Sequence, residues 1–262
     1  NVAWGIPLPF DASHTTYVWV DAFLNYLTAL GWNGDTGEVP AAWPADIHMI
    51  GKDILRVHAT IWPAVLMHLG LPTQKSLLVN GFILSGGRKM SKSLGNVISV
   101  DDMLEKFGTD GTRYLLMSAG HFGDDVDLTM ERMTETYNAH LANGLGNLVS
   151  RILKLLESVE NIPSKVVEST EDDFRYLMEE NKISEALAFV MQQVSLANKY
   201  IDDHKPWILV KEDQEKFREV MLNLQSKIAY IAFWLQPFLP ETAKKIETAL
   251  QTGKTEPLFQ RI

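Results

Sequence analysis

The chain has 262 residues, 46% of them hydrophobic, and a formal net charge of −9 at pH 7. Its length allows two compact units, because a single hydrophobic core stops growing at roughly 250–300 residues. The acidic balance argues against a protein that coats nucleic acid indiscriminately. No apolar run reaches the roughly 20 residues of a membrane-spanning helix. The lack of cysteine excludes disulfides and thiolate metal sites, as is typical of cytoplasmic proteins.

The first 85 residues alternate short β-rich runs with helical ones. Strands separated by helices predict a parallel α/β sheet, whose ligands gather beyond the carboxyl ends of the strands. We expect strands over residues 16–20, 46–51 and 76–84, helices over 22–30 and 53–69, and a loop over 34–37.

Two stretches lie where the first two predicted strands end. Trp19, Ala22 and Tyr26 could line one apolar pocket, although a core aromatic cluster is the commoner explanation of such a group. Ile54 and His58 are spaced i, i+4 and share a helix face. A histidine on such a face is more often structural than functional.

A basic loop over residues 86–96 reads Gly-Gly-Arg-Lys-Met-Ser-Lys-Ser-Leu-Gly-Asn. Between residues 54 and 100 the chain has five Lys or Arg residues and no Asp or Glu. Such a loop suits a polyphosphate, because mobile ammonium groups can stabilise charge that moves onto a leaving pyrophosphate. A solvated basic turn is the ordinary alternative.

The pentapeptide Lys89-Met90-Ser91-Lys92-Ser93 is the KMSKS signature of class I aminoacyl-tRNA synthetases. With the Trp19–Tyr26 stretch and the string Gly-Lys-Asp-Ile…His…Trp-Pro over residues 51–63, it resembles the methionyl-tRNA synthetase family. The leucine, isoleucine and valine enzymes share the loop but lack that string. The resemblance extends from about Thr16 to the C-terminus.

The resemblance implies a methionine-tRNA ligase, which activates methionine with Mg²⁺-ATP to methionyl-adenylate and transfers it to tRNA(Met) in the cytoplasm, without a membrane partner. It implies catalytic roles for Lys89 and Lys92, with the stronger transition-state role for Lys92. The implied methionine site comprises Trp19, Ala22, Tyr26, Ile54 and His58, and the implied ATP site comprises Gly51, Asp53, Lys89, Ser91 and Lys92.

Two departures from the family pattern matter. The His-Ile-Gly-His-type ATP motif, the first half of the nucleotide fold and the zinc-bearing insertion have no counterpart in these residues, and the chain begins with Asn1 rather than methionine. We therefore expect a C-terminal fragment that is catalytically incomplete by itself, with no metal ligands of its own and zinc possible only in the missing part. Asn80 stands where the family often has histidine, so we assign it no catalytic role.

Beyond the loop the sequence reads as helical. A helix starts near Ser99, breaks over residues 108–111 and resumes over 112–119, and Thr129 caps a long helix after a loop over 120–127. Further helices are expected over 183–201, 217–235 and 242–250, with an exposed loop over 162–170. No strand signal intervenes, which predicts an antiparallel helical bundle.

Asn143, Asn147 and Arg151 recur every four positions and form one polar stripe. Such a stripe is usually only solvated, but the resemblance assigns anticodon binding to Asn147, Arg151 and Trp207. Amide and guanidinium groups can pair with base edges, and a partly exposed indole can stack on an unstacked base. Trp234, by contrast, reads as core.

The expected fold class is α/β followed by all-α. Residues 1–85 would form the second half of a Rossmann-like catalytic domain, 86–134 the lysine loop and a stem-contact linker, and 135–262 an anticodon-binding helical domain. Two other functions stay open: another class I synthetase, and a tRNA-binding or scaffold module without catalysis.

Overall fold

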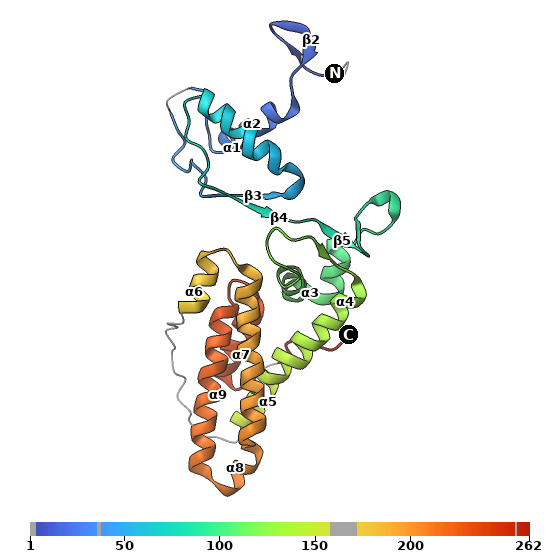
Figure 1. Cartoon of the computed structure of the whole chain (residues 1–262). Helices are drawn as coiled ribbons and strands as arrows, with labels where there is room; N and C mark the ends of the chain where they lie inside the picture. The colour runs from blue at the N-terminus through green and yellow to red at the C-terminus, as the bar shows by residue number, and fades with distance from the viewer. Residues whose placement is uncertain (1–3, 36–37, 158–171, 255) are drawn as a thin grey trace. The chain divides into compact units, whose positions relative to one another are not determined.

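The computed structural model describes residues 4–35, 38–157, 172–254 and 256–262, which form two compact units (Figure 1). Residues 1–82 with 122–124 belong to unit 1, and residues 83–121 with 125–262 belong to unit 2. In the described ranges no helix combines the length and apolarity that crossing a membrane requires.

Unit 1 is built on a parallel pair of strands and two helices. β3 (Ile47–Gly51) pairs with β4 (Ser76–Asn80) in register, and the connection between them contains the short 3-10 helix η1 (Lys52–Ile54) and α2 (Leu55–His68). A hairpin of β1 (Pro7–Leu8) and β2 (Asp11–Thr15) precedes α1 (Val18–Thr28). The parallel sheet and the helix over 53–69 were therefore predicted correctly.

A small apolar core joins α1 to α2. Phe23 and Leu27 of α1 and Trp62 and Leu66 of α2 are at most 1% exposed. These pairs are spaced i, i+4, so each helix turns one apolar stripe toward the other. This packing fixes the positions of the side chains that were predicted to bind methionine.

Two strand predictions in this region were wrong. Residues 18–20 start α1 instead of ending a strand, because the apolar residues Trp19 and Phe23 are spaced for a helix face that packs on α2. The run over 76–84 is two strands. β4 ends at Asn80, and β5 (Ile83–Ser85) pairs in a different sheet of unit 2.

Unit 2 begins with that three-stranded sheet, ordered β6-β5-β7. β6 (Arg88–Lys89) is antiparallel to β5, and β7 (Val126–Asp127), within the segment predicted to be a loop, is parallel to it. The 3-10 turn η2 (Lys92–Leu94) leads to α3 (Val100–Met117). The helix starts where it was predicted, with the Ser99 hydroxyl as its cap, and Gly108, with φ of 68°, kinks it within the predicted break.

One long helical run then leads into the bundle. It comprises α4 (Met130–Thr136), capped by Thr129 as predicted, a ten-residue π-helix η3 (Tyr137–Gly146), and α5 (Asn147–Leu156). A π-helix is rare in proteins and often accompanies function. The sequence pattern did not reveal it.

The bundle packs α5, α7 and α9 together with α10 around one apolar core (Figure 1). Three predicted helices are present with longer bounds, as α7 (Ile183–His204), α9 (Gln214–Leu235) and α10 (Pro240–Thr252). Two short helices, α6 (Asp172–Glu179) and α8 (Pro206–Glu212), were not predicted. The predicted loop over 162–170 lies outside the described residues.

Candidate functional site

An aromatic cluster at the α1–α2 junction brings together most of the predicted methionine-binding residues. The Tyr26 hydroxyl lies 3.0 Å from Nε2 of His58, and the Trp19 ring meets the His58 ring edge-on at 5.7 Å. His58 is 1% exposed, whereas Trp19 is half-buried and Tyr26 is 37% exposed. The cluster thus has a buried polar centre and a more open aromatic side.

The hydrogen bonds of His58 define the polarity of this centre. Its Nδ1 lies 3.0 Å from the Ile54 carbonyl oxygen, which can only accept, so Nδ1 carries a proton. In the neutral imidazole Nε2 is then an acceptor, and the Tyr26 hydroxyl donates to it. The phenol oxygen keeps its lone pairs free for a weak contact. Ala22, the fifth predicted residue, lies exposed on α1.

Three residues of the cluster were not predicted. Phe23 packs edge-on against His58 at 5.0 Å, Trp62 stacks on Phe23 at 5.3 Å, and His48 of β3 lies 4.5 Å from the Tyr26 ring. Helical spacing from Trp19 and His58 could have revealed Phe23 and Trp62. Strand alternation could have revealed His48, because His48 and Ile50 are buried while Ile47 and Met49 are exposed.

Two ring nitrogens of this cluster are buried without hydrogen-bond partners among the described residues. They are Nε1 of Trp62 and Nδ1 of His48. Burial lowers the pKa of His48, and the nearby His58 lowers it further. A neutral His48 ring therefore fits this apolar setting.

Gly51 and Asp53, the predicted ribose-binding pair, lie where β3 ends and η1 begins. A Cβ on Gly51 would lie 2.7 Å from the Asp53 carboxylate oxygen, so glycine lets that carboxylate lie close over the strand end. Neither η1 nor α2 has a side-chain hydrogen bond at its N-cap, so Asp53 does not cap a helix here. The Asp53 side chain is exposed.

The lysine loop is more ordered than its glycine content suggests. Gly86 and Gly87, with φ of 61° and 72°, form a two-residue hairpin turn between β5 and β6. Lys89 is exposed at the end of β6, and the Ser91 and Ser93 hydroxyl oxygens lie 2.7 Å apart. Lys92 begins η2, and its side chain lies outside the described structure.

Asn96 holds this loop together, a role the sequence did not suggest. Its side-chain oxygen accepts from the Ser91 amide at 2.9 Å, and its nitrogen donates to the Lys89 and Ser85 carbonyls at 3.2 and 3.4 Å. One side chain thereby joins both hairpin strands to the turn that carries Lys92. Asn96 is a positioning residue for the loop.

A second cluster, in the bundle, contains the predicted anticodon residues Arg151 and Trp207. The Arg151 guanidinium lies 5.9 Å from the centre of the Trp207 ring and donates to Asp202 at 2.5 Å and to Asn198 at 3.4 Å. Trp207 is 44% exposed, whereas Trp234 is 3% exposed, as expected for a core residue. Arg151 and Trp207 thus present a cation and an open indole side by side.

The turn before Trp207 is strained. Lys205, between α7 and α8, has a φ of 44°, which is uncommon for a residue with a side chain, and Pro206 starts α8. Pro206 is buried, while Trp207 next to it remains open. The turn therefore holds the Trp207 indole in its exposed position.

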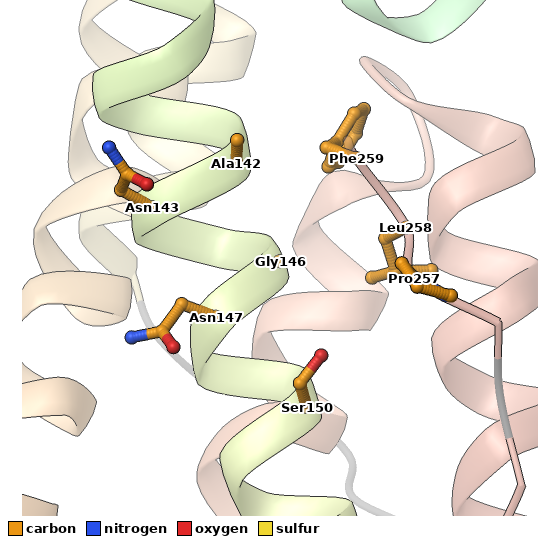
Figure 2. Close-up of a pocket in the computed structure, with 8 residues that line it drawn as sticks. All are labelled: Ala142, Asn143, Gly146, Asn147, Ser150, Pro257, Leu258 and Phe259. Atoms are coloured by element: carbon orange, nitrogen blue, oxygen red, sulfur yellow. The ribbon is translucent and has the colours of Figure 1, made fainter. Parts of the chain in front are cut away.

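Asn147, the third predicted anticodon residue, projects from the same side of the helix as Asn143, which supports the predicted polar stripe (Figure 2). Both asparagines and Ser150 line a cavity of about 350 Å³, whose other wall is the C-terminal segment 257–259. In the described residues, no group of three His, Asp or Glu side chains could hold a metal ion.

Comparison with protein families decides the classification. Residues 1–153 match the family described as tRNA synthetases class I (M), and residues 158–259 match the anticodon binding domain of methionyl tRNA ligase. The chain belongs to the methionyl class I tRNA synthetases. It therefore combines part of a class I synthetase catalytic fold with an anticodon-binding domain.

Among methionyl synthetase relatives, the methionine–tRNA ligase of Clostridium acetobutylicum is 41% identical, and the match covers 94% of this chain and 41% of that protein. The Rickettsia felis enzyme is 37% identical, with 99% and 54% covered. The chain thus spans about half or less of these relatives' length.

A solved synthetase structure has a similar fold. Mycobacterium tuberculosis methionyl-tRNA synthetase in complex with methionyl-adenylate matches with a TM-score of 0.84 and 32% identity over 99% of this chain and 59% of that one. Its apo form matches with a TM-score of 0.80 and 29% identity.

Proposed function

We propose that this chain takes part in charging tRNA(Met) with methionine. The methionine carboxylate attacks the α-phosphorus of Mg²⁺-ATP, which gives methionyl-adenylate and releases pyrophosphate. The terminal ribose of the tRNA then accepts the methionyl group, and AMP leaves. Positioning and charge stabilisation account for these steps, so no side chain acts as a covalent nucleophile.

The aromatic cluster is the proposed methionine site, formed by Trp19, Ala22, Tyr26, Ile54 and His58. A thioether is apolar and polarizable, and it packs favourably against aromatic rings such as Trp19 and Tyr26. When the Tyr26 hydroxyl turns from Nε2 of His58 toward a ligand, it can donate a weak hydrogen bond to the sulfur, which a branched alkane cannot accept. This difference would favour methionine over leucine.

The proposed ATP site comprises Gly51, Asp53, Lys89, Ser91 and Lys92. The exposed Asp53 carboxylate, with glycine at position 51 giving it room, suits the ribose hydroxyls. The ammonium groups of Lys89 and Lys92 would follow charge onto the departing pyrophosphate, and Mg²⁺ would arrive with ATP. We keep the stronger transition-state role for Lys92.

Anticodon recognition is proposed for Asn147, Arg151 and Trp207. The open Trp207 ring offers a stacking platform, worth about 1–3 kcal/mol per base. The guanidinium of Arg151 beside that ring supplies donors for a base edge.

The proposed division of labour follows the sequence prediction. Residues 1–85 belong to catalysis, 86–134 to the lysine loop and its linker, and 135–262 to anticodon binding. Charging supplies translation, so we place the activity in the cytoplasm.

The observation that carries this proposal is the open Trp207 indole beside Arg151, within a chain whose two parts both match methionyl synthetase families. The experiment compares the affinity of the 262-residue chain for RNA stem-loops with CAU, GAU and CAC anticodons. We expect the CAU stem-loop to bind at least tenfold more tightly than the other two. Equal binding of all three would contradict anticodon recognition.

A further inference from the structure

A second cavity in unit 2, of about 390 Å³, lies between α3, η3 and α7. One face of α7 forms its long side, from Ser184 through Gln192 and Ser195 to Asn198. These end residues are fourteen positions apart, so the side extends roughly 21 Å at the rise of an α-helix. The cavity is therefore elongated along α7.

The lining combines hydrogen-bonding side chains with an apolar surface. On η3, Nδ1 of His140 forms a 2.7 Å hydrogen bond with the buried Tyr114 hydroxyl. This bond does not use the other ring nitrogen of His140, Nε2. Among the described residues, the Gln192 amide and the Ser118 hydroxyl have no hydrogen-bond partner. Ser195 donates to the Met191 carbonyl at 3.1 Å and keeps its acceptor capacity.

This set of groups restricts the ligand. None of the described residues lining the cavity is Lys, Arg, Asp or Glu, so the lining does not suit a phosphate group. It also has no open indole or phenyl face for base stacking, because Tyr114 is 2% exposed. Hydroxyl, amide and imidazole groups instead match sugar hydroxyls, which both donate and accept.

One lining residue, Asn198, links the cavity to the proposed anticodon site. Asn198 lines the cavity, and its side-chain oxygen accepts from Arg151, which lies over the Trp207 ring. The Asn198 amide nitrogen donates to the Gly144 carbonyl of η3, another lining residue. An RNA strand leaving Trp207 in this direction would thus run along α7.

We infer that this cavity binds ribose 2′-hydroxyl groups of the RNA strand adjoining the anticodon, with Gln192, Ser195 and His140 as the contacting side chains. The inference rests on the proposed function, because the anticodon site supplies the RNA. A 2′-hydroxyl is the group that distinguishes RNA from DNA, so this cavity makes the binding RNA-specific.

The test combines protein and RNA changes in a double-mutant cycle. The CAU stem-loop is made with 2′-deoxy substitutions at one position at a time, and its affinity is measured for the wild-type chain and for Gln192→Ala. Gln192 is exposed, so its replacement leaves the fold intact. Gln193→Ala, the adjacent glutamine outside the cavity lining, is the matched control, and Ser195→Ala is a second test variant.

At one or more positions, we expect the deoxy substitution to weaken wild-type and Gln193→Ala binding by about threefold to tenfold, as for one lost hydrogen bond. The same substitution should not weaken Gln192→Ala further. If no position is coupled to Gln192 or Ser195 while CAU preference persists, the inference is wrong and the proposed function stands. If the chain shows no CAU preference, both fail.

Discussion

The Tyr26 hydroxyl donates to Nε2 of His58 across the α1–α2 junction, over 3.0 Å. The opposite nitrogen of the same ring is held by the Ile54 carbonyl, so the imidazole cannot turn without losing a hydrogen bond. This pair orients the polar centre of the proposed methionine site.

Replacing Tyr26 with phenylalanine removes the donor to His58 and the hydroxyl near the proposed thioether position. We expect methionine affinity to fall about fivefold to tenfold, as for the loss of one hydrogen bond, while norleucine affinity changes little. An NMR titration of the Trp19 indole signal measures both. Tyr17→Phe, whose ring lies outside the cluster, is the control, and equal losses for both variants would contradict the assignment.

Acid should destabilise unit 1 through His48. Burial lowers the pKa of folded His48 below its ordinary value of 6.5, so between these two values the unfolded chain binds more protons. The free energy of unfolding therefore falls as pH drops below about 6.5, until the folded ring is also protonated. Urea unfolding, followed by tryptophan fluorescence, should show a smaller loss for His48→Gln. The exposed His68, changed to Gln, should leave the wild-type loss unchanged.

The lysine loop should loosen when Asn96 is replaced with alanine. Three hydrogen bonds from one side chain would be lost, including the one that protects the Ser91 amide. We expect about tenfold faster hydrogen exchange at that amide, with exchange in α9 unchanged. Asn223→Ala, on the exposed side of α9, is the matched control. Unchanged exchange at Ser91 would rule out the positioning role.

Asp110 should stabilise unit 2 by capping α10 from α3. Its carboxylate accepts from the Thr242 amide at 2.6 Å, and the side chain is 6% exposed. Asp110→Ala should lower the free energy of unfolding by about 1–3 kcal/mol, measured in urea. The exposed Glu105→Ala on the same helix should cost far less. Equal effects would show that the contact adds no stability.

Local signals predicted the capped and periodic elements well. Ser99, Thr129 and the Gly108 kink have chemical signatures within a few residues, and the apolar periodicity of α7 and α9 extends over several turns. The strand prediction at the start of α1 was wrong because the β-branched and aromatic residues there favour a strand locally. Packing against α2 makes them helical.

The sites were less accessible from sequence than the helices. Motifs proposed Trp19, Tyr26 and His58, which the structure brings together, but Asn96, Asp202 and His48 act through partners brought together by folding. The π-helix η3 gives no periodic signal that separates it from an α-helix over ten residues. Tertiary contacts decide such features.

The most direct test of anticodon recognition is the affinity of the chain for a CAU stem-loop after Trp207→Ala. Loss of a stacked base predicts a decrease of at least tenfold. Phe233→Ala removes a similarly exposed aromatic ring from α9 and should leave the affinity unchanged. An affinity of Trp207→Ala within twofold of wild type would contradict the account.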